Sequence, residues 1–468
     1  MIPLILRAVL VAGLLAGAAA PAAAEEAPAW LAGPDARSVR IHDSVFDTEA
    51  YVYEAGRSEN PPVVLVHGLG SEGASVWRRL IPELAEAYHV VAMDLPGFGR
   101  SGKPNARYSP RRYAAFLDDV MARFTDGPVV LVGHSMGAAI ALDYAHLHPD
   151  RVRRLILAST AGILHGAAYA RFLSRIGVER FLPDVPGLGR AAGRLVQRVL
   201  SKFESLGVDP ADALRTAQSR QLYLGADPMR IAGLALVSTD FSRIIRDTGV
   251  PTLLLWGTED DVAPLRVGYL LTATLPHARL VTVEGGGHMF IFNRADRFNA
   301  LVVHALGLSA AAFRAYAEDD YPQPESAPAT DRTGECRGES GRAFSGDYRR
   351  LVIQDCNDVR IRNAHIGILQ ILDSDVSIRN SDVIASAHTA VVMANSRVEM
   401  TAVTVRGRVA VNATGSVVDA AGVHFVGTEA AVRAPAPSAF TFSVSRIDSP
   451  YGSGFFHDVY SVTADDPL

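Results

Sequence analysis

One stretch of the sequence indicates the fold class: Val129-Val130-Leu131-Val132-Gly133-His134-Ser135-Met136-Gly137-Ala138-Ala139-Ile140. A β-branched apolar run leads through G-x-S-x-G into small residues, which is the order strand, sharp turn and helix. Glycines at 133 and 137 let neighbouring backbone pass close to the turn, and the turn exposes the Ser135 hydroxyl above a sheet. The N-terminus of the following helix points at developing negative charge. We therefore predict that Ser135 is a catalytic nucleophile, against the alternative of an ordinary glycine-rich turn.

Length and composition bound the architecture. The chain has 468 residues, 49% of them hydrophobic, and a net charge of −5. This length predicts two or three domains, and the composition is that of a globular protein with ample core. Arginine is plentiful but scattered, without a basic run or interleaved aromatic residues. We therefore expect no nucleic-acid partner.

The N-terminal segment has the pattern of a secretory signal. Arg7 precedes an apolar run at 8–20, and Ala22-Ala23-Ala24 offers an A-x-A cleavage site before Glu25. The alternative is an uncleaved membrane anchor, but Pro21 and the many alanines make the segment short and weakly apolar. We predict a signal peptide at 1–24, export to the periplasm or medium, and no stable membrane span after cleavage.

The chain has two cysteines, Cys336 and Cys356. An exported destination favours a disulfide between them, because the compartments outside the cytoplasm are oxidising. Two buried free thiols are the alternative.

A second motif supplies backbone donors. The apolar strand that begins at Pro61 ends in His67-Gly68-Leu69-Gly70, and such a strand suits the middle of a parallel sheet. The amides of this glycine-rich loop can lie open, so we expect the amides of Leu69 and Met136 to form an oxyanion hole. We expect His67 to hold the loop rather than to act as a base.

An acid and a histidine follow two later strands. The strand at 251–257 leads into a loop with three candidate acids, Glu259, Asp260 and Asp261, and the strand at 278–283 leads to His288. His288 can take the serine proton near neutral pH and return it to the leaving group, while a carboxylate fixes its tautomer. The order serine, acid, histidine is that of α/β-hydrolases.

Between about 161 and 246 the strand rhythm stops. The segment is rich in Leu, Ala and Arg at helical spacing and is broken by prolines and glycines. We predict a helical lid over the elbow; a helical subdomain without a role in substrate choice is the alternative.

These residues carry a family resemblance. The region from about 39 to 308 resembles the α/β-hydrolase superfamily, in its lid-bearing esterase and C–C-hydrolase-like branch. The matching motifs are H-G-L-G at 67–70, D-L-P-G-F-G-R-S at 94–101, G-H-S-M-G at 133–137, W-G-T-E-D at 256–260 and G-G-G-H at 285–288. The resemblance implies an α/β-hydrolase fold over 25–309 and selects Asp260, which lies three residues after the glycine of W-G-x-x-D and four before a proline. A serine at the elbow differs from the aspartate of haloalkane dehalogenases and epoxide hydrolases.

The last third of the chain has a different pattern. Residues 310–333 have the composition of a linker, and short β-rich segments recur over 334–468. Apolar residues recur at a spacing of about 20 in three series: Val359, Val376, Val398, Val418, Phe440; Ile361, Ile378, Met400, Ala420, Phe442; and Ile366, Val383, Val405, Phe425, Ile447. This repeat indicates a β-solenoid and resembles a right-handed parallel β-helix, with a small β-sandwich as the alternative. The two cysteines would then pin its N-terminal cap.

Acidic residues in this region have two interpretations. One interpretation of Asp355, Asp358, Asp373, Asp375 and Asp382 is calcium or sugar binding, but acids at solenoid corners are more often turn formers. We therefore expect a stabilising or adhesive module rather than a second enzyme.

Together these features predict an exported serine hydrolase that cleaves carboxylic esters of small-molecule or acylated substrates through an acyl-enzyme, with Ser135, His288 and Asp260 as triad and no metal or organic cofactor. C–C bond hydrolysis, amide hydrolysis and perhydrolysis are alternatives on the same site. An alternative of another class is a polysaccharide-binding protein, in which the C-terminal domain carries the function and the hydrolase removes acyl groups.

Overall fold

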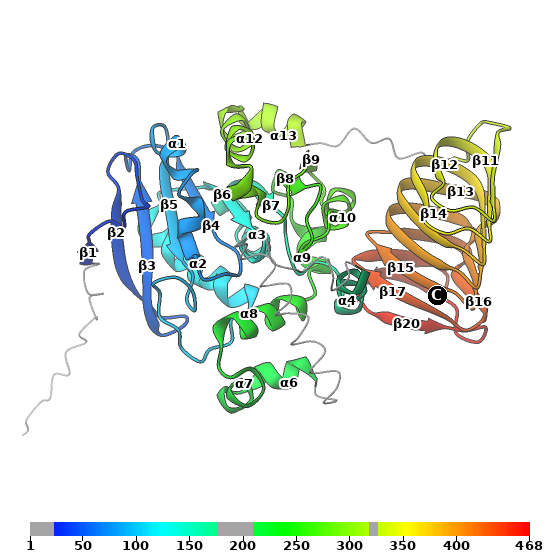
Figure 1. The fold of residues 1–468 in the computed structure, drawn as a ribbon, viewed down its shortest axis with the longest axis horizontal. Coiled ribbons are helices and arrows are strands. Elements are labelled where there is room, and N and C mark those ends of the chain that lie inside the picture. The colour runs from blue at the N-terminus through cyan, green and yellow to red at the C-terminus, as the bar shows by residue number, and fades with distance from the viewer. Residues whose placement is uncertain (1–22, 176–208, 318–325) are drawn as a thin grey trace, which may run out of the picture.

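The computed structural model describes residues 23–175, 209–317 and 326–468. Two bodies lie side by side, a sheet flanked by helices and a separate stack of strands (Figure 1). Most of the predicted signal peptide and residues 176–208 of the predicted lid lie outside the described residues.

A nine-stranded sheet forms the first body, in the order β1-β2-β3-β5-β4-β6-β7-β8-β9. The first three strands pair antiparallel and those from β5 to β9 pair parallel. The strands are β1 (Ala23–Glu25), β2 (Arg37–Asp43), β3 (Thr48–Ala55), β4 (Pro62–Val66), β5 (His89–Asp94), β6 (Val129–His134), β7 (Val152–Ala158), β8 (Thr252–Gly257) and β9 (Ala278–Val283).

Helices cover both faces of this sheet, and two buried clusters result. Successive strand residues point to opposite faces, so Val64 and Leu131 join one cluster while Val63 and Val132 join the other. The helices are α1 (Ile81–Ala85), α2 (Pro110–Phe124), α3 (Met136–Leu147), α4 (Gly166–Arg175), α6 (Pro210–Arg215), α7 (Ala217–Leu224), α8 (Pro228–Val237), α9 (Ser242–Asp247), α10 (Arg266–Thr274), α11 (Phe290–Asn293), α12 (Ala295–Gly307) and α13 (Ala310–Ala317). The first cluster lies under α2, α3, α9 and α10, and the second under α1 and α12. A doubly covered sheet explains why the central strands are apolar throughout.

The segment predicted as a lid contains helices wherever it is described, namely α4 and α6 to α9. Asp209, Thr216 and Asp227 cap α6, α7 and α8 with side-chain oxygens that accept backbone N–H hydrogen bonds.

The predicted linker at 310–333 begins as a helix instead. Helix α13 packs on the hydrolase sheet through Phe313, which is fully buried and lies 4.7 Å from the Arg154 guanidinium. Three consecutive alanines, at 310–312, favour a helix, and one aromatic side chain is enough to dock it. The hydrolase body therefore extends to at least residue 317.

The second body is a β-rich domain with an eleven-stranded mixed sheet. Its strands are β10 (Thr333–Arg337), β11 (Ala343–Gln354), β12 (Val359–Leu372), β13 (Asp375–Ala394), β14 (Arg397–Thr414), β15 (Val417–Ala421), β16 (His424–Ala436), β17 (Ser438–Ser443), β18 (Ser445–Ser449), β19 (Gly452–Phe456) and β20 (Val459–Val462). Pairing from β10 to β18 is parallel, and only the last strands, β19 and β20, pair antiparallel.

The sequence repeat matches this pairing. Val359 pairs with Val376, Val376 with Val398, Val398 with Val418, and Val418 with Phe440. Equivalent apolar residues therefore stack on one another and fill a continuous interior. The separate β-rich domain is thus present, while the right-handed parallel β-helix stays a prediction.

Small polar residues organise the edges of this domain. Ser374, Ser396, Ser416 and Ser438 each accept a hydrogen bond from a backbone N–H one repeat earlier, at 3.0–3.2 Å. Asp355, Asp358 and Asp373 have positive φ angles, as turn-forming residues do. At the first repeats a disulfide joins Cys336 to Cys356.

Candidate active site

Ser135 stands at the turn between β6 and α3. Its backbone has φ 55° and ψ −119°, a conformation that L-residues rarely adopt. A Cβ atom on Gly133 would lie 2.5 Å from the Gly137 carbonyl oxygen, and one on Gly137 would lie 2.2 Å from that of Val66. Both glycines are therefore required by close backbone approach, and the turn lifts Ser135 above the carboxyl ends of β4 and β6.

A chain of hydrogen bonds links the three predicted residues. The Nε2 atom of His288 lies 3.0 Å from Ser135 Oγ, and its Nδ1 atom lies 3.0 Å from both carboxylate oxygens of Asp260. A carboxylate only accepts hydrogen bonds, so Nδ1 carries the proton and the neutral ring presents Nε2 as acceptor to the serine hydroxyl. The arrangement can move the hydroxyl proton to His288 as Ser135 attacks an electrophile.

Asp260 accepts hydrogen bonds from its own loop and from the residue that follows β7. Its side chain is fully buried and accepts hydrogen bonds from the amides of Val262 and Ala263 at 2.9 and 2.8 Å. The Ser159 hydroxyl donates to the other oxygen at 2.6 Å. Glu259 instead uses its backbone amide to bind the Gly286 carbonyl. Of the three candidate acids, Asp260 is the one whose carboxylate contacts His288.

His134 is a neighbour that the sequence analysis did not single out. Its Nε2 atom donates to the His288 carbonyl oxygen at 3.0 Å, and the two rings lie 5.0 Å apart. Burial, and then the adjacent His288, lower the pKa of His134 to about 3, so the ring stays neutral. The sequence carries a signal for this residue, because His134 is the x before the serine in G-x-S-x-G and the elbow holds that position beside the nucleophile.

The loop at 67–70 lies against Ser135. The amide of Leu95 donates to His67 Nε2 at 3.0 Å, while His67 Nδ1 donates to the Gly68 carbonyl at 2.7 Å. His67 therefore fixes the loop as a neutral ring, and burial lowers its pKa. Leu69 and Ser135 line the same cavity, and Met136 is the first residue of α3, so its amide has no acceptor within the helix.

The motif at 94–101 has a structural role. Asp94 accepts hydrogen bonds from the amides of Ala74 and Arg100 and from the Tyr53 hydroxyl, at 2.7–2.8 Å. It ties the loop after β5 to β3 and to the loop after β4.

Within 23–175, 209–317 and 326–468, no group of three or more His, Cys, Asp or Glu side chains is arranged to hold a metal ion. Over those ranges, no helix is long and apolar enough to cross a bilayer.

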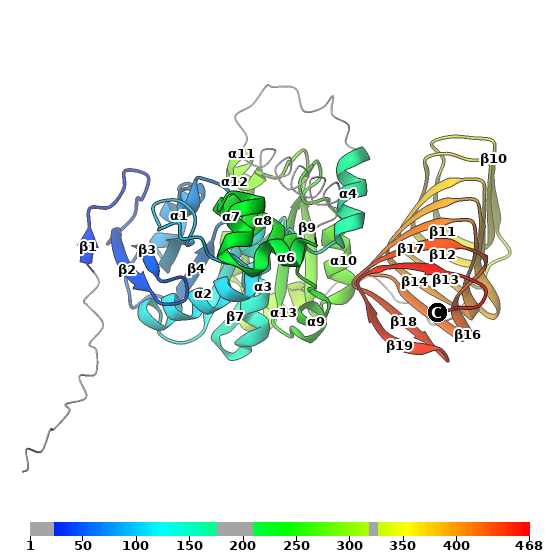
Figure 2. The same cartoon turned by 90° about the horizontal axis from the view of Figure 1, so that it is seen from below.

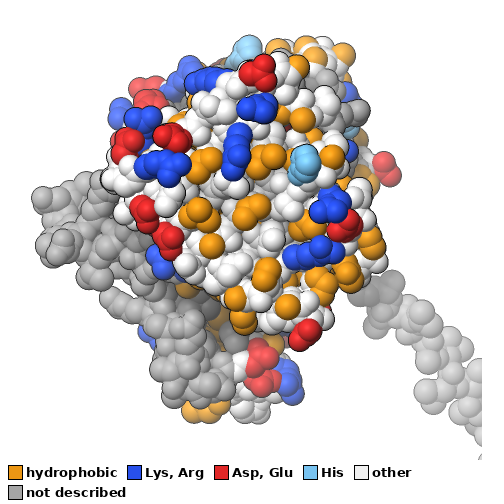
Figure 3. Space-filling model, turned by 90° about the vertical axis from the view of Figure 1, so that its right-hand side faces the viewer, with side chains coloured by type: hydrophobic (Ala, Val, Ile, Leu, Met, Phe, Trp, Pro, Cys, Tyr) orange, Lys and Arg blue, Asp and Glu red, His pale blue; other side chains and the backbone are white. Residues whose placement is uncertain are grey.

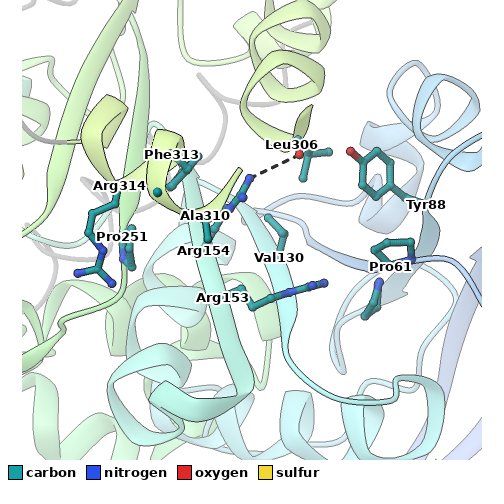
Figure 4. A pocket seen from close by; sticks show the side chains of 12 residues that line it. Pro61, Tyr88, Val130, Arg153, Arg154, Pro251, Leu306, Ala310, Phe313 and Arg314 are labelled. Carbon is teal, nitrogen blue, oxygen red and sulfur yellow. Dashed lines mark hydrogen bonds between the residues drawn. The ribbon is translucent and has the colours of Figure 1, made fainter. Parts of the chain in front are cut away.

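A cavity of about 660 Å³ lies at the opposite, amino end of the sheet (Figure 4). Its lining includes Pro61, Val130 and Pro251, which precede or begin their strands, and Arg154, which donates to the Leu306 carbonyl. The cavity is separate from Ser135, which follows the carboxyl end of β6.

Comparison with known proteins identifies the family of the first body. The family model of the alpha/beta hydrolase fold matches residues 61–295, about half of the chain. The chain is 29% identical over 257 residues to a 2-hydroxy-6-oxo-6-(2'-aminophenyl)hexa-2,4-dienoic acid hydrolase of Metapseudomonas resinovorans, covering 53% of this chain and 84% of that protein. It is 28% identical over 250 residues to a pimeloyl-[acyl-carrier protein] methyl ester esterase of Chromobacterium violaceum, covering 53% and 94%. A solved esterase from Exiguobacterium antarcticum overlaps with a TM-score of 0.44 at 20% identity, covering 59% of this chain and 100% of that one. The chain belongs to the α/β hydrolase fold family.

Proposed function

We propose that this hydrolase is a serine esterase that cleaves carboxylic esters through an acyl-enzyme. The observation that carries the proposal is the hydrogen-bonded series Ser135, His288 and Asp260, with the amides of Leu69 and Met136 beside the serine. The esterase of C. violaceum supports an ester as substrate class.

Each residue then has one task. Ser135 Oγ attacks the ester carbonyl while its proton passes to His288 Nε2, and the two amides stabilise the oxyanion. The C–O bond breaks, and His288 returns the proton to the departing alcohol. A water molecule then gives its proton to His288 and attacks the acyl carbon, which releases the acid and restores Ser135. Asp260 stabilises the imidazolium in both halves.

The test is release of p-nitrophenol from acyl esters of increasing chain length. We expect hydrolysis by the unmodified chain and a loss of about 10⁴-fold or more in kcat for Ser135→Ala. Ser58→Ala, on an exposed loop, is the matched control and should keep full activity. Equal rates for Ser135→Ala and the unmodified chain would contradict the proposal.

C–C bond hydrolysis is a second candidate on the same residues. The M. resinovorans relative, a 2-hydroxy-6-oxo-dienoic acid hydrolase, motivates it. A 2-hydroxy-6-oxo-dienoate absorbs light, so its cleavage is followed by loss of that absorbance. Turnover of this substrate without turnover of any ester would replace the esterase proposal by this one.

We also propose that the protein is exported. The disulfide between Cys336 and Cys356 supports this, because such bonds persist outside the reducing cytoplasm. Fractionation of producing cells with N-terminal sequencing should find the protein outside the cytoplasm, beginning near Glu25. A cytoplasmic chain that retains its first residues would contradict the proposal.

Polysaccharide binding by the β-rich domain stays a prediction. The face of this domain that points away from the hydrolase carries small hydrophobic side chains between charged ones (Figure 3). Retention of full-length Ser135→Ala on glycan beads would support it, and passage through every glycan tested would count against it.

A further inference from the structure

The β-rich domain is docked on the hydrolase beside the predicted lid. Helices α4 and α10 lie between the hydrolase sheet and the strand stack in two perpendicular views (Figures 1 and 2). Side chains from β13, β14, β15 and β17 face them, namely Arg379, Glu399, Asp419 and Ser443.

An arginine at the start of α10 is paired with two acids of the other domain. The Arg266 side chain is only 9% exposed, and its guanidinium lies 3.2 Å from Glu399 and 3.1 Å from Asp419. Charged groups are rarely this buried unless they are paired. Separating the two domains would leave the Arg266 guanidinium without these two carboxylates, so the ion pairs favour the docked arrangement.

The second oxygen of Asp419 binds a different helix. Arg171, on α4, lies 3.2 Å from Asp419 Oδ2, while Arg266 binds Oδ1. Just before α4, the amide of His165 donates to the Ser443 hydroxyl at 2.9 Å. Asp419 thus joins the first helix of the predicted lid to the helix after the loop that carries Asp260.

Both helices are close to the candidate active site. Arg266 is six residues after Asp260, and the intervening loop is held by the bond from the Trp256 indole to the Ala263 carbonyl. Tyr169, on α4, is half-buried; burial and the charges of Asp260 and Asp261 raise the pKa of its phenol. A shift of either helix would therefore move groups that lie close to Asp260, the partner of His288.

Apolar contacts make the docking continuous with the hydrolase core. Ala421 and Val444 belong to the same buried cluster as Leu270 and Leu271 of α10. A Cβ atom on Gly422 would lie 3.1 Å from the Leu270 Cα atom, so the backbones of the two domains lie in close contact here.

We propose that Asp419, supported by Glu399 and Ser443, is a positioning residue for the hydrolase site: it fixes α4 and the Asp260 loop relative to each other and thereby sets the shape of the acyl pocket. The inference rests on the proposed function. The β-rich domain then influences the active site through its contacts with α4 and α10 and is not an independent module.

The experiment compares Asp419→Asn with Asp448→Asn in the full chain. An asparagine presents an N–H group to one of the two arginines, so α4 or α10 should shift. Asp448 also pairs with an arginine and a histidine, but within the β-rich domain alone. The readouts are kcat and KM for p-nitrophenyl butyrate and octanoate, and the rate at which an alkyl fluorophosphonate labels Ser135.

We expect Asp419→Asn to change the octanoate-to-butyrate ratio of kcat/KM by about tenfold, with Asp448→Asn unchanged. Ser443→Ala should change it in the same direction by less, and serves if Asp419→Asn does not fold. A ratio and labelling rate within twofold of the unmodified chain would overturn the proposal, even if the melting temperature fell. If no ester is hydrolysed, the esterase function fails while the labelling rates still decide positioning; no labelling of the unmodified chain would overturn both.

Discussion

The two bodies of this protein use buried polar side chains in opposite ways. In the hydrolase they converge: His134 and Ser135 of the elbow meet Asp260 and His288, from two later loops, at one end of the sheet. In the β-rich domain they are dispersed, with one serine per repeat at 374, 396, 416 and 438. Each serine satisfies a single amide of the neighbouring repeat, and no two serve a common point.

This difference distinguishes buried polar side chains that serve a reaction from those that stabilise the fold. Buried polar groups must be satisfied in both cases, because an unpaired one costs free energy. Where they converge, one change should abolish a reaction and leave the fold; where they repeat, one change should cost a little stability and nothing else. Each prediction below tests this contrast or the boundary between the two bodies.

The largest effect is expected at the acid of the convergent site. Asp260→Asn should lower kcat by about 10⁴-fold, because an amide can donate to Nδ1 and favour the wrong tautomer of His288. Asp261→Asn is the control and should keep at least a third of the activity. Ester hydrolysis at saturating substrate measures both; equal losses would show that the acid has been misassigned.

The next effect is expected at the boundary. Arg266→Ala should lower the free energy of unfolding by about 3 kcal/mol, since Glu399 and Asp419 both lose their contact with this buried guanidinium. Arg360→Ala, which breaks an exposed pair with Asp358, should cost less than about 0.5 kcal/mol. Urea unfolding compares them, and a similar cost for both would mean that the docked interface is weak.

A site residue can be predicted from the sequence when a short local motif marks its position. Ser135 and His288 follow from short motifs, because the elbow and the loop after β9 are local structures. The acid did not follow from the residues alone, since Glu259, Asp260 and Asp261 share one loop; the family pattern selected Asp260, and the structure places its carboxylate on His288.

Other features had weak signals or none. The pairing of β12 to β18 was readable from the apolar spacing, and the serine series was present at 22, 20 and 22 residues but was overlooked. Docking was not readable, because Arg266 and Asp419 are single charges 153 residues apart and nothing local marks either. Helix α13 falls in the stretch whose composition predicts a linker, because that composition does not reveal the burial of Phe313.

The contact between the two bodies should also make the stability of the protein depend on pH. His165 and His457 lie 5.3 Å apart between the two bodies, facing Asp240 and Asp458, with Arg171 and Asp419 nearby. Burial lowers the pKa of His457 to about 4 and lowers that of His165. Unfolding returns His457 to a pKa of about 6.5, so between pH 6.5 and 4 the unfolded chain binds more protons.

Stability should therefore be constant above pH 6.5 from this source and fall by about 2 kcal/mol as the pH drops to 5. His457→Gln, which cannot be protonated, should flatten the dependence. Melting temperatures of both proteins at pH 7.5 and 5 measure the difference, and parallel losses would assign the pH dependence to other groups.

The smallest effect is expected within the repeat. Ser396 Oγ accepts from the Ser374 amide at 3.2 Å and donates to the Ala394 carbonyl at 2.6 Å, and the residue is 5% exposed. Ser396→Ala leaves one buried amide without an acceptor, so we expect a loss of about 1 kcal/mol with ester hydrolysis unchanged. Ser386→Ala, at an exposed position of β13, should change neither. If Ser396→Ala instead lowered activity without lowering stability, the serine series would transmit structure to the hydrolase, and the division between converging and repeating polar groups would fail.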